Sequence, residues 1–193
     1  MPPARTDTTR ERVVEAADTC FSRYGVAKTT VEDIAAAAGL SRATVYRAFT
    51  GGRDELILAV VLRDLALFLD RLAERLAGQT SVSDGIVEGV LDAVSFVRSE
   101  PQMAQFLVPE AAGHTQAVVA GAAERVLELC CDYVRPYFDL ARRERLVRDD
   151  VEVEGAMEFL FRIISSMTVM PLHRDDEATR RFVRTYIVPA LVA

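Results

Sequence analysis

Apolar side chains recur every three or four residues through most of this chain, which is the spacing of one face of an α-helix. No stretch shows sustained alternation of apolar and polar residues between tight glycine turns, as a β-hairpin does. The pattern therefore predicts an all-α fold of about nine helices. The expected helices span roughly residues 8–24, 31–38, 42–49, 53–77, 86–97, 102–108, 117–133, 153–170 and 177–191.

The stretch TTVEDIAAAAGLSRATVYRAFTGGRDE, residues 29–55, has the pattern of two short helices joined by a tight turn. Thr30 and Asp33 have the spacing of a capping box, in which each side chain satisfies a free backbone N–H at a helix start. Gly39 can close the first helix in the left-handed conformation. Ser41 then follows as the N-cap of the second helix. These signals together predict a helix-turn-helix.

The second of these short helices carries side chains that can contact DNA. Val45 and Phe49, four residues apart, are expected to anchor it inward. Arginine can hold guanine through two hydrogen bonds, a threonine or alanine methyl can touch the thymine methyl, and hydroxyl groups suit phosphate oxygens. The residues left on its outer surface are Arg42, Ala43, Thr44, Tyr46 and Arg47. The alternative is that these side chains merely face water.

This segment, extended upstream through Thr8–Gly25, resembles the DNA-binding region of the TetR family of transcriptional regulators. Tyr46, Phe49 and Arg53 stand where that family has a Tyr-x-x-Phe pair and a basic residue opening the next helix. The usual glycine of the recognition helix is Ala43 here, and the connection Thr50-Gly51-Gly52 is one residue longer than the commonest form. The DNA-binding residues expected from pattern and resemblance are Thr29, Thr30, Ser41, Arg42, Ala43, Thr44, Tyr46, Arg47 and Arg53.

The resemblance implies two domains. Residues 1–52 would form a three-helix DNA-binding domain, and residues 53–193 a helical ligand-binding and dimerisation domain, with the helix from Arg53 bridging the two. In the family, a small molecule enters between the helices of the second domain and alters the separation of the DNA-binding heads. Candidates to line such a cavity are Phe68, Phe96, Met103, Phe106, Leu107, His114, Tyr133, Phe161 and Arg162. Each apolar candidate has ordinary core packing as its alternative, and Arg162 could instead form a buried ion pair with Glu158.

The helices expected at 153–170 and 177–191 are apolar on more than one side, so they need partners on more than one face. Two such helices from each of two subunits would form a four-helix dimer interface. The rival interpretation is that both helices fill the core of one subunit. Because a helix-turn-helix that reads two half-sites needs a dimer, we expect a homodimer with Phe159, Ile163, Met167, Phe182 and Tyr186 at its interface.

The net charge of −6 is unexpected for a protein that binds DNA. Up to Ile57, however, eight basic residues balance eight acidic ones, so the acidic excess lies entirely in the remainder of the chain. A neutral head predicts modest, salt-sensitive affinity for non-specific DNA. No window is long and apolar enough to span a membrane, and the polar N-terminus lacks the apolar region of a secretion signal. A cytoplasmic protein is expected.

Arrangements typical of catalysis or metal binding are not found. His114 and His173 lie in different segments, and neither has a second ligand at metal-binding spacing. Cys20, Cys130 and Cys131 are expected to be buried apolar residues, with a thiol sensor at the adjacent pair as the alternative. We therefore expect no metal, no cofactor and no enzymatic activity.

These observations favour a ligand-responsive DNA-binding transcriptional regulator, interpreted as a repressor that a small apolar or amphipathic effector releases from its operator. Its expected partners are double-stranded operator DNA, a second copy of the chain and the effector, without a membrane. The alternative function is a helical small-molecule sensor or carrier whose head contacts protein rather than DNA.

Overall fold

The computed structural model describes residues 5–77, 81–100, 103, 116–170, 172 and 175–193. Apart from one isolated bridge between Val147 and Val192, every regular element in these ranges is helical, which confirms the all-α prediction. The helix expected at 102–108 lies outside the described residues except for Met103. The elements are α1 (Arg5–Tyr24), η1 (Val26–Lys28), α2 (Val31–Ala37), α3 (Arg42–Ala48), α4 (Gly52–Leu76), α5 (Val82–Ser99), α8 (Gln116–Arg143), α9 (Val153–Val169), α10 (Asp176–Phe182), η2 (Val183–Ile187) and α11 (Val188–Leu191).

Internal contacts divide the chain into two compact units. One contains Met1–Asp64 with Pro101–Ala122, and the other contains Leu65–Glu100 with Ala123–Ala193. Helix α4 thus contributes its first half to one unit and its second half to the other. The domain boundary expected after residue 52 stays a prediction.

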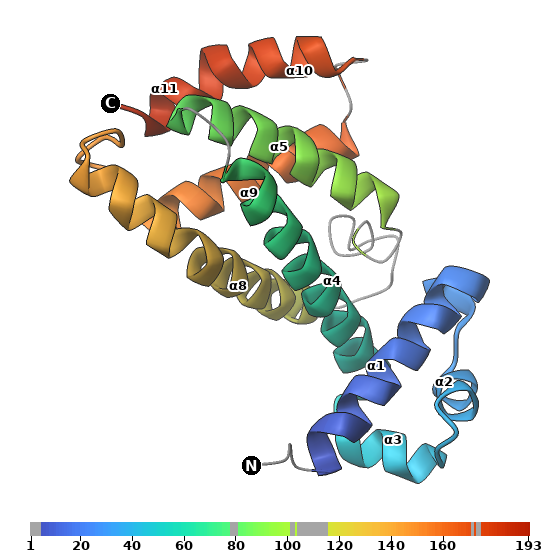
Figure 1. The fold of residues 1–193 in the computed structure, drawn as a ribbon. Helices are drawn as coiled ribbons and strands as arrows, with labels where there is room; N and C mark the ends of the chain where they lie inside the picture. Colours follow the sequence, from blue (N-terminus) through green and yellow to red (C-terminus); the bar gives the residue numbers. More distant parts are fainter. Residues whose placement is uncertain (1–4, 78–80, 101–102, 104–115, 171, 173–174) are drawn as a thin grey trace. The chain divides into compact units, whose positions relative to one another are not determined.

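The first unit is built around α1, with the short helices α2 and α3 beside it (Figure 1). Its core forms because each helix turns one apolar face inward. Fully buried side chains come from α1, α2, α3, the residue after α3 and the start of α4: Val13, Ala17, Ile34, Val45, Phe49, Leu56, Ile57, Val60 and Val61. The inward role expected for Val45 and Phe49 is confirmed.

Three arginines tie the elements of the first unit together through backbone carbonyls at their ends. Arg12 of α1 donates to the carbonyl of Ala38, with Nε 3.0 Å and Nη2 2.6 Å from the oxygen, just beyond the end of α2. Arg10 donates to the carbonyl of Ala48 at the end of α3, and its guanidinium lies over the Phe49 ring, 4.1 Å from the centroid. Arg53 donates to the carbonyl of Val26 in η1. The carbonyls of Ala38 and Ala48 lie at the C-terminal ends of α2 and α3, where backbone acceptors lack helical partners, so Arg12 and Arg10 satisfy them. The Val26 carbonyl also accepts from the Thr29 N–H at 3.3 Å, so Arg53 adds a second donor there.

The second unit packs α9, α10 and η2 against α5 (Figure 1). Valines of α5 and the apolar residues of the C-terminal helices form one buried cluster: Val87, Val90, Val94, Val183, Ile187 and Val188. A second cluster joins the end of α8, the start of α9 and Leu191. The C-terminus is held in place because the Arg148 N–H donates to the Leu191 carbonyl at 3.1 Å.

Three element boundaries differ from the sequence prediction. Helix α1 begins at Arg5, three residues before the start expected at residue 8. Helix α8 continues through Pro136 to Arg143, although the sequence placed its end near the proline. The final helix is interrupted by the π-helical turn η2, which precedes Pro189.

Candidate nucleic-acid interface

The turn between α2 and α3 has the geometry that its sequence signals predict. The Thr30 hydroxyl accepts from the Asp33 N–H at 3.2 Å, and the Asp33 carboxylate accepts from the Thr30 N–H at 2.9 Å. The hydrogen bonds from Thr30 hold the pKa of Asp33 below its usual value. Gly39 adopts a φ of 62°, which an L side chain rarely adopts and glycine allows. Ser41 caps α3 by accepting from the Thr44 N–H at 3.2 Å.

One face of α3 carries a connected row of polar side chains. The hydroxyl oxygens of Ser41 and Thr44 lie 2.9 Å apart, and Arg47 Nη2 donates to the Thr44 hydroxyl at 3.3 Å. Ala43 and Arg47 are exposed, and Thr44 is half-buried. Because Val45 and Phe49 hold the opposite side of the helix in the core, this row faces solvent. It brings together an arginine, a methyl group and hydroxyls on a surface that a duplex could reach.

Arg42 lies at the N-terminal end of the same helix and is held by two neighbours. Its Nη1 lies 2.5 Å from the Glu32 carboxylate of α2, and its guanidinium carbon lies 5.4 Å from the centroid of the Tyr46 ring. The interaction with the Tyr46 hydroxyl, followed by the Glu32 charge, raises the pKa of Arg42. Arg42, Tyr46 and Glu32 are all exposed. The predicted residues Thr30, Ser41, Arg42, Ala43, Thr44, Tyr46 and Arg47 thus lie on α3 or beside it, at the starts of α2 and α3.

Two further predicted residues make their contacts inside the first unit. Thr29 has 2% of its surface exposed, and its hydroxyl donates to the carbonyls of Gly25 and Cys20 at 2.9 and 3.2 Å. Its side chain therefore joins η1 to α1 and is turned away from solvent. The Arg53 guanidinium is partly buried and donates to backbone carbonyls of η1 and of Thr29. It is thus engaged with backbone carbonyls of the protein, and its expected contact with phosphate stays a prediction.

Sequence reasoning did not single out one exposed cation next to this surface. Lys28 ends η1, one residue before buried Thr29 and two before the α2 cap, and it is exposed. The sequence could have indicated this residue, because Lys28 is the one lysine of the chain and lies two residues before the capping box.

The residues proposed to line an effector cavity are only partly described. Phe106, Leu107 and His114 lie outside the described residues. Phe68 of α4 and Phe96 of α5 are buried and stacked, with ring centroids 4.4 Å apart and planes 9° from parallel. Tyr133 of α8 is half-buried, and a hydrogen bond to Asp70 of α4 raises its pKa. Phe161 is half-buried, and Met103 is buried within the other unit.

Arg162 lies on the protein surface. Its side chain is 74% exposed and pairs with Glu158, with Nε 3.1 Å from the carboxylate oxygen. The ion pair expected between these residues is present, but it is on the surface rather than buried. Arg162 lies on the solvent face of α9, whose opposite face packs on α5 through Ile163 and Met167.

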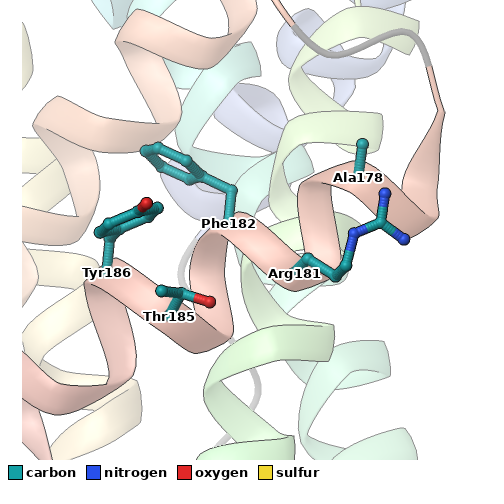
Figure 2. A pocket seen from close by; sticks show the side chains of 5 residues that line it. All are labelled: Ala178, Arg181, Phe182, Thr185 and Tyr186. Carbon is teal, nitrogen blue, oxygen red and sulfur yellow. The ribbon is translucent and has the colours of Figure 1, made fainter.

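The five residues proposed for the dimer interface differ in their surroundings. Phe159, Ile163 and Met167 are half-buried against the core cluster of the second unit, as the rival interpretation has it. Tyr186 is 67% exposed, and its ring centroid lies 5.2 Å from that of half-buried Phe182. Figure 2 shows these two rings side by side along a shallow surface groove of about 320 Å³, lined by Ala178, Arg181, Phe182, Thr185 and Tyr186.

The three cysteines are poorly suited to redox sensing. Burial raises the pKa of the Cys130 thiol to about 12, and it also raises the pKa values of Cys131 and Cys20. A thiol with a raised pKa holds little of the reactive thiolate at neutral pH. Among the described residues, no cluster of His, Cys, Asp and Glu could hold a metal ion, and no helix in these ranges is long and apolar enough to cross a membrane.

Comparisons with known proteins show that the segment carrying this surface matches a known family. Residues 13–60, which contain the whole turn motif, match the family described as "Bacterial regulatory proteins, tetR family". The uncharacterized HTH-type transcriptional regulator TtgW of Pseudomonas putida is 33% identical over 103 residues, which cover 53% of this chain and 72% of that protein. The uncharacterized HTH-type transcriptional regulator Rv1255c of Mycobacterium tuberculosis is 25% identical over 192 residues, covering 96% of this chain and 86% of that protein.

The same fold occurs in a solved structure of a regulator with a bound small molecule. The crystal structure of RolR in complex with resorcinol has a TM-score of 0.74 at 16% identity, covering 97% of this chain and 89% of that one. On the family match, the relatives and the fold, this chain belongs to the TetR family of bacterial transcriptional regulators, which bind DNA and are not enzymes.

Proposed function

We propose that this chain is a cytoplasmic, dimeric repressor that reads an operator with α3 and leaves it when a small apolar or amphipathic effector binds. The observation that carries the DNA-reading role is the solvent-facing row of Ser41, Thr44 and Arg47 on a helix whose other side is locked in the core. Because Val45 and Phe49 are fully buried, they fix the rotation of α3 about its axis and so keep this row on the protein surface.

The chemistry of the row suits the major groove. An arginine can donate two hydrogen bonds to guanine O6 and N7, and a threonine methyl can contact the thymine methyl. The exposed groups at the starts of α2 and α3 suit phosphate oxygens, which position a protein on DNA without reading sequence. In a dimer, two such helices would enter successive major grooves about 34 Å apart.

Substitution of Arg47 tests the reading role. Arg47→Ala is expected to lower the affinity for a duplex that the wild-type protein selects from a random-sequence pool. The loss should be about 5- to 150-fold for each head, the range of one bidentate base contact. Binding is measured by fluorescence anisotropy at fixed salt concentration. Arg143→Ala, which removes an exposed arginine at the end of α8, is the matched control.

The comparison of these variants can contradict the assignment. If Arg47→Ala binds the selected duplex as tightly as the wild type while Arg143→Ala does the same, α3 does not read this DNA through Arg47. Circular dichroism and light scattering check that Arg47→Ala keeps the fold and the oligomeric state, which is expected because the side chain is exposed.

The effector role rests on the aromatic residues of the second unit and on a structural relative. The stacked pair Phe68 and Phe96, with Phe161 and Tyr133 on other helices of the unit, provides apolar and aromatic side chains with few polar groups. Such a composition is typical of small-molecule sites. RolR, which shares the fold, was crystallised with the small aromatic molecule resorcinol.

The proposed response is a shift between two conformations of the protein. An effector that binds better to the conformation unable to match both major grooves lowers operator affinity by the ratio of its affinities for the two states. Small aromatic compounds, resorcinol included, can be titrated into the complex with the selected duplex. A compound that releases the duplex should need a higher concentration with Phe161→Ala, and an unchanged concentration would remove Phe161 from the site.

A further inference from the structure

One acidic side chain projects from the surface proposed to meet DNA. Glu32 lies in the first turn of α2, is exposed, and reaches Arg42 of α3, with 2.5 Å between the carboxylate oxygen and Nη1. The other exposed carboxylate of that turn, Asp33, is held in the capping box by Thr30. Glu32 is therefore the carboxylate of this turn that faces the arginine of the recognition helix.

The charge of Glu32 opposes any contact that Arg42 makes with phosphate. A duplex carries about one negative charge per 1.7 Å of its axis, so a carboxylate on the contact surface is repelled. The same carboxylate neutralises Arg42, whose guanidinium is also drawn over the Tyr46 ring. In the free protein, Arg42 thus has a partner within the head and adds little to its attraction for DNA.

The ion pair between Glu32 and Arg42 is weak compared with a guanine contact but similar in strength to a phosphate contact. Both side chains are more than half exposed, 60% for Arg42 and 54% for Glu32. An exposed ion pair shifts an equilibrium by about fivefold or less, and a single phosphate contact formed in water has a similar strength. A bidentate contact with guanine is worth about 5- to 150-fold. Guanine can therefore take Arg42 from Glu32 with a net gain in affinity, whereas a phosphate contact gains about as much as the broken ion pair loses.

We infer that Glu32 is a specificity-determining residue of the DNA-binding head. The ion pair keeps Arg42 bound to Glu32 when the head meets the phosphates of non-specific DNA. It breaks where guanine offers Arg42 its two hydrogen-bond acceptors. This inference rests on the proposed function. It means that a residue of α2 influences how α3 discriminates between DNA sequences.

The test measures binding to DNA of random sequence, so it requires no knowledge of the operator. Wild type and Glu32→Gln are titrated against a labelled 30-base-pair random duplex over a range of KCl concentrations. Freeing Arg42 for one phosphate should steepen the slope of log affinity against log salt by about 0.9 per head, hence about 1.8 for a dimer. Near 0.1 M salt, the affinity of Glu32→Gln should rise by up to about fivefold for each head, the strength of the ion pair that is removed.

The selected duplex gives the second readout. Its affinity should rise less than that of the random duplex, because Arg42 already leaves Glu32 in the specific complex. The ratio of the two affinities, which measures specificity, is therefore expected to fall in Glu32→Gln. A merely structural role for Glu32 would change neither the salt slope nor this ratio.

Two further variants separate the role of Arg42 from a general effect of charge. Glu15→Gln removes the same charge from an exposed position of α1 outside the turn motif and should leave the slope unchanged. Glu32→Gln should raise the affinity less in the Arg42→Ala background than in the wild type, because only the direct repulsion between the Glu32 carboxylate and DNA is then removed. An unchanged slope in Glu32→Gln, or an equal gain in both backgrounds, overturns the inference. If the wild type binds neither duplex, the proposed function itself fails.

Discussion

At the scale of single residues, five arginines of the first unit fall into two groups that composition cannot distinguish. Arg10, Arg12 and Arg53 donate to carbonyls at the ends of short helices, whereas Arg42 and Arg47 are exposed on α3. An arginine in either group adds the same charge to the head. The count of basic residues therefore overstates the number that DNA can meet, and a head with fewer free cations depends more on base contacts for its affinity.

Thiol reactivity can also be predicted residue by residue. In the native protein at pH 8, iodoacetamide should modify Cys130 slowly, because burial raises its pKa to about 12. Cys131 and Cys20, whose pKa values burial also raises, should be protected too. Mass spectrometry after timed labelling measures each site, with the protein unfolded in guanidinium as the control. Rapid native labelling at Cys130 or Cys131 would restore the thiol-sensor alternative.

At the scale of elements, short helices hold their place through their ends. Helix α2 spans Val31–Ala37, too short to be stable alone. It is closed at one end by the Thr30 capping box and at the other by Gly39 and Arg12. The local signals for both caps are in the sequence, which is why its limits could be predicted closely. Arg12, which donates to the Ala38 carbonyl at the end of α2, lies 26 residues away in the sequence. Its contact could not be predicted from local signals.

The C-terminal end of α2 gives a prediction for stability. Gly39→Ala should lower the free energy of unfolding by about 1–2 kcal/mol, because a side chain is strained at a φ of 62° and its Cβ would lie 3.1 Å from Arg12 Nη2. Chemical denaturation measures the change.

The matched control is Gly155→Ala in α9, where nothing lies within 4 Å of an added Cβ. There the substitution should stabilise the protein by about 0.5–1 kcal/mol, since alanine favours helix over glycine. Equal effects at the two positions would show that neither the left-handed backbone at Gly39 nor the approach of Arg12 matters.

Proline 136 shows how tertiary contacts can outweigh a local signal. A proline inside a helix costs about 3 kcal/mol and commonly ends or kinks it. Helix α8 nevertheless continues for two more turns, which carry Phe138 and Ala141 into a cluster with Val153 and Leu191. Burial of one large apolar side chain contributes about 1.5–3 kcal/mol, so the contacts beyond the proline can offset its cost. The partners in that cluster are distant in sequence, and the pattern around Pro136 did not reveal them.

At the scale of the whole molecule, two ion pairs join α5 to the C-terminal helices. Arg180 holds Glu88 through two hydrogen bonds of 3.0 and 2.9 Å, and Arg184 lies 2.8 Å from Asp84. The bond from Arg180 lowers the pKa of Glu88, and the bonds from Ser81 and Arg184 lower that of Asp84. These residues are about a hundred positions apart, so the pairs exist only in the folded chain.

A pH dependence of stability follows from these lowered pKa values. A carboxyl group whose pKa is lower in the folded state stabilises the fold above its unfolded pKa, and loses that effect as pH falls through its folded pKa. The unfolded values are near 4.5 for Glu88 and 3.8 for Asp84. The free energy of unfolding should therefore fall as pH decreases below about 5.

Denaturant titrations between pH 7 and pH 3 measure this dependence. Glu88→Gln should flatten the curve below pH 5, since it removes one of the titrating groups. Glu177→Gln, at an ion pair whose two side chains are 67% exposed, is the control and should change the curve little. A curve for Glu88→Gln parallel to that of the wild type would contradict the role of the Arg180 pair.

The oligomeric state also belongs to the whole molecule. If the groove beside Phe182 and Tyr186 is covered by a second copy, Tyr186→Glu should convert the dimer to monomer, because it buries an unpaired charge in an apolar contact. Light scattering coupled to size exclusion measures the mass. Leu140→Glu, at another exposed apolar residue, is the control. If the Tyr186→Glu protein stays dimeric, the dimer interface does not include this groove.

The sequence by itself determined the helical class, the turn motif with its two caps and the family, because these depend on periodicity and on interactions between residues a few positions apart. Only the tertiary structure decided that Thr29 and Arg53 serve the inside of the head, that Arg162 stays in solvent, and that Glu32 reaches Arg42. The physical reason is that a side chain's role depends on which distant backbone or charge folding brings beside it, and no local pattern records those neighbours.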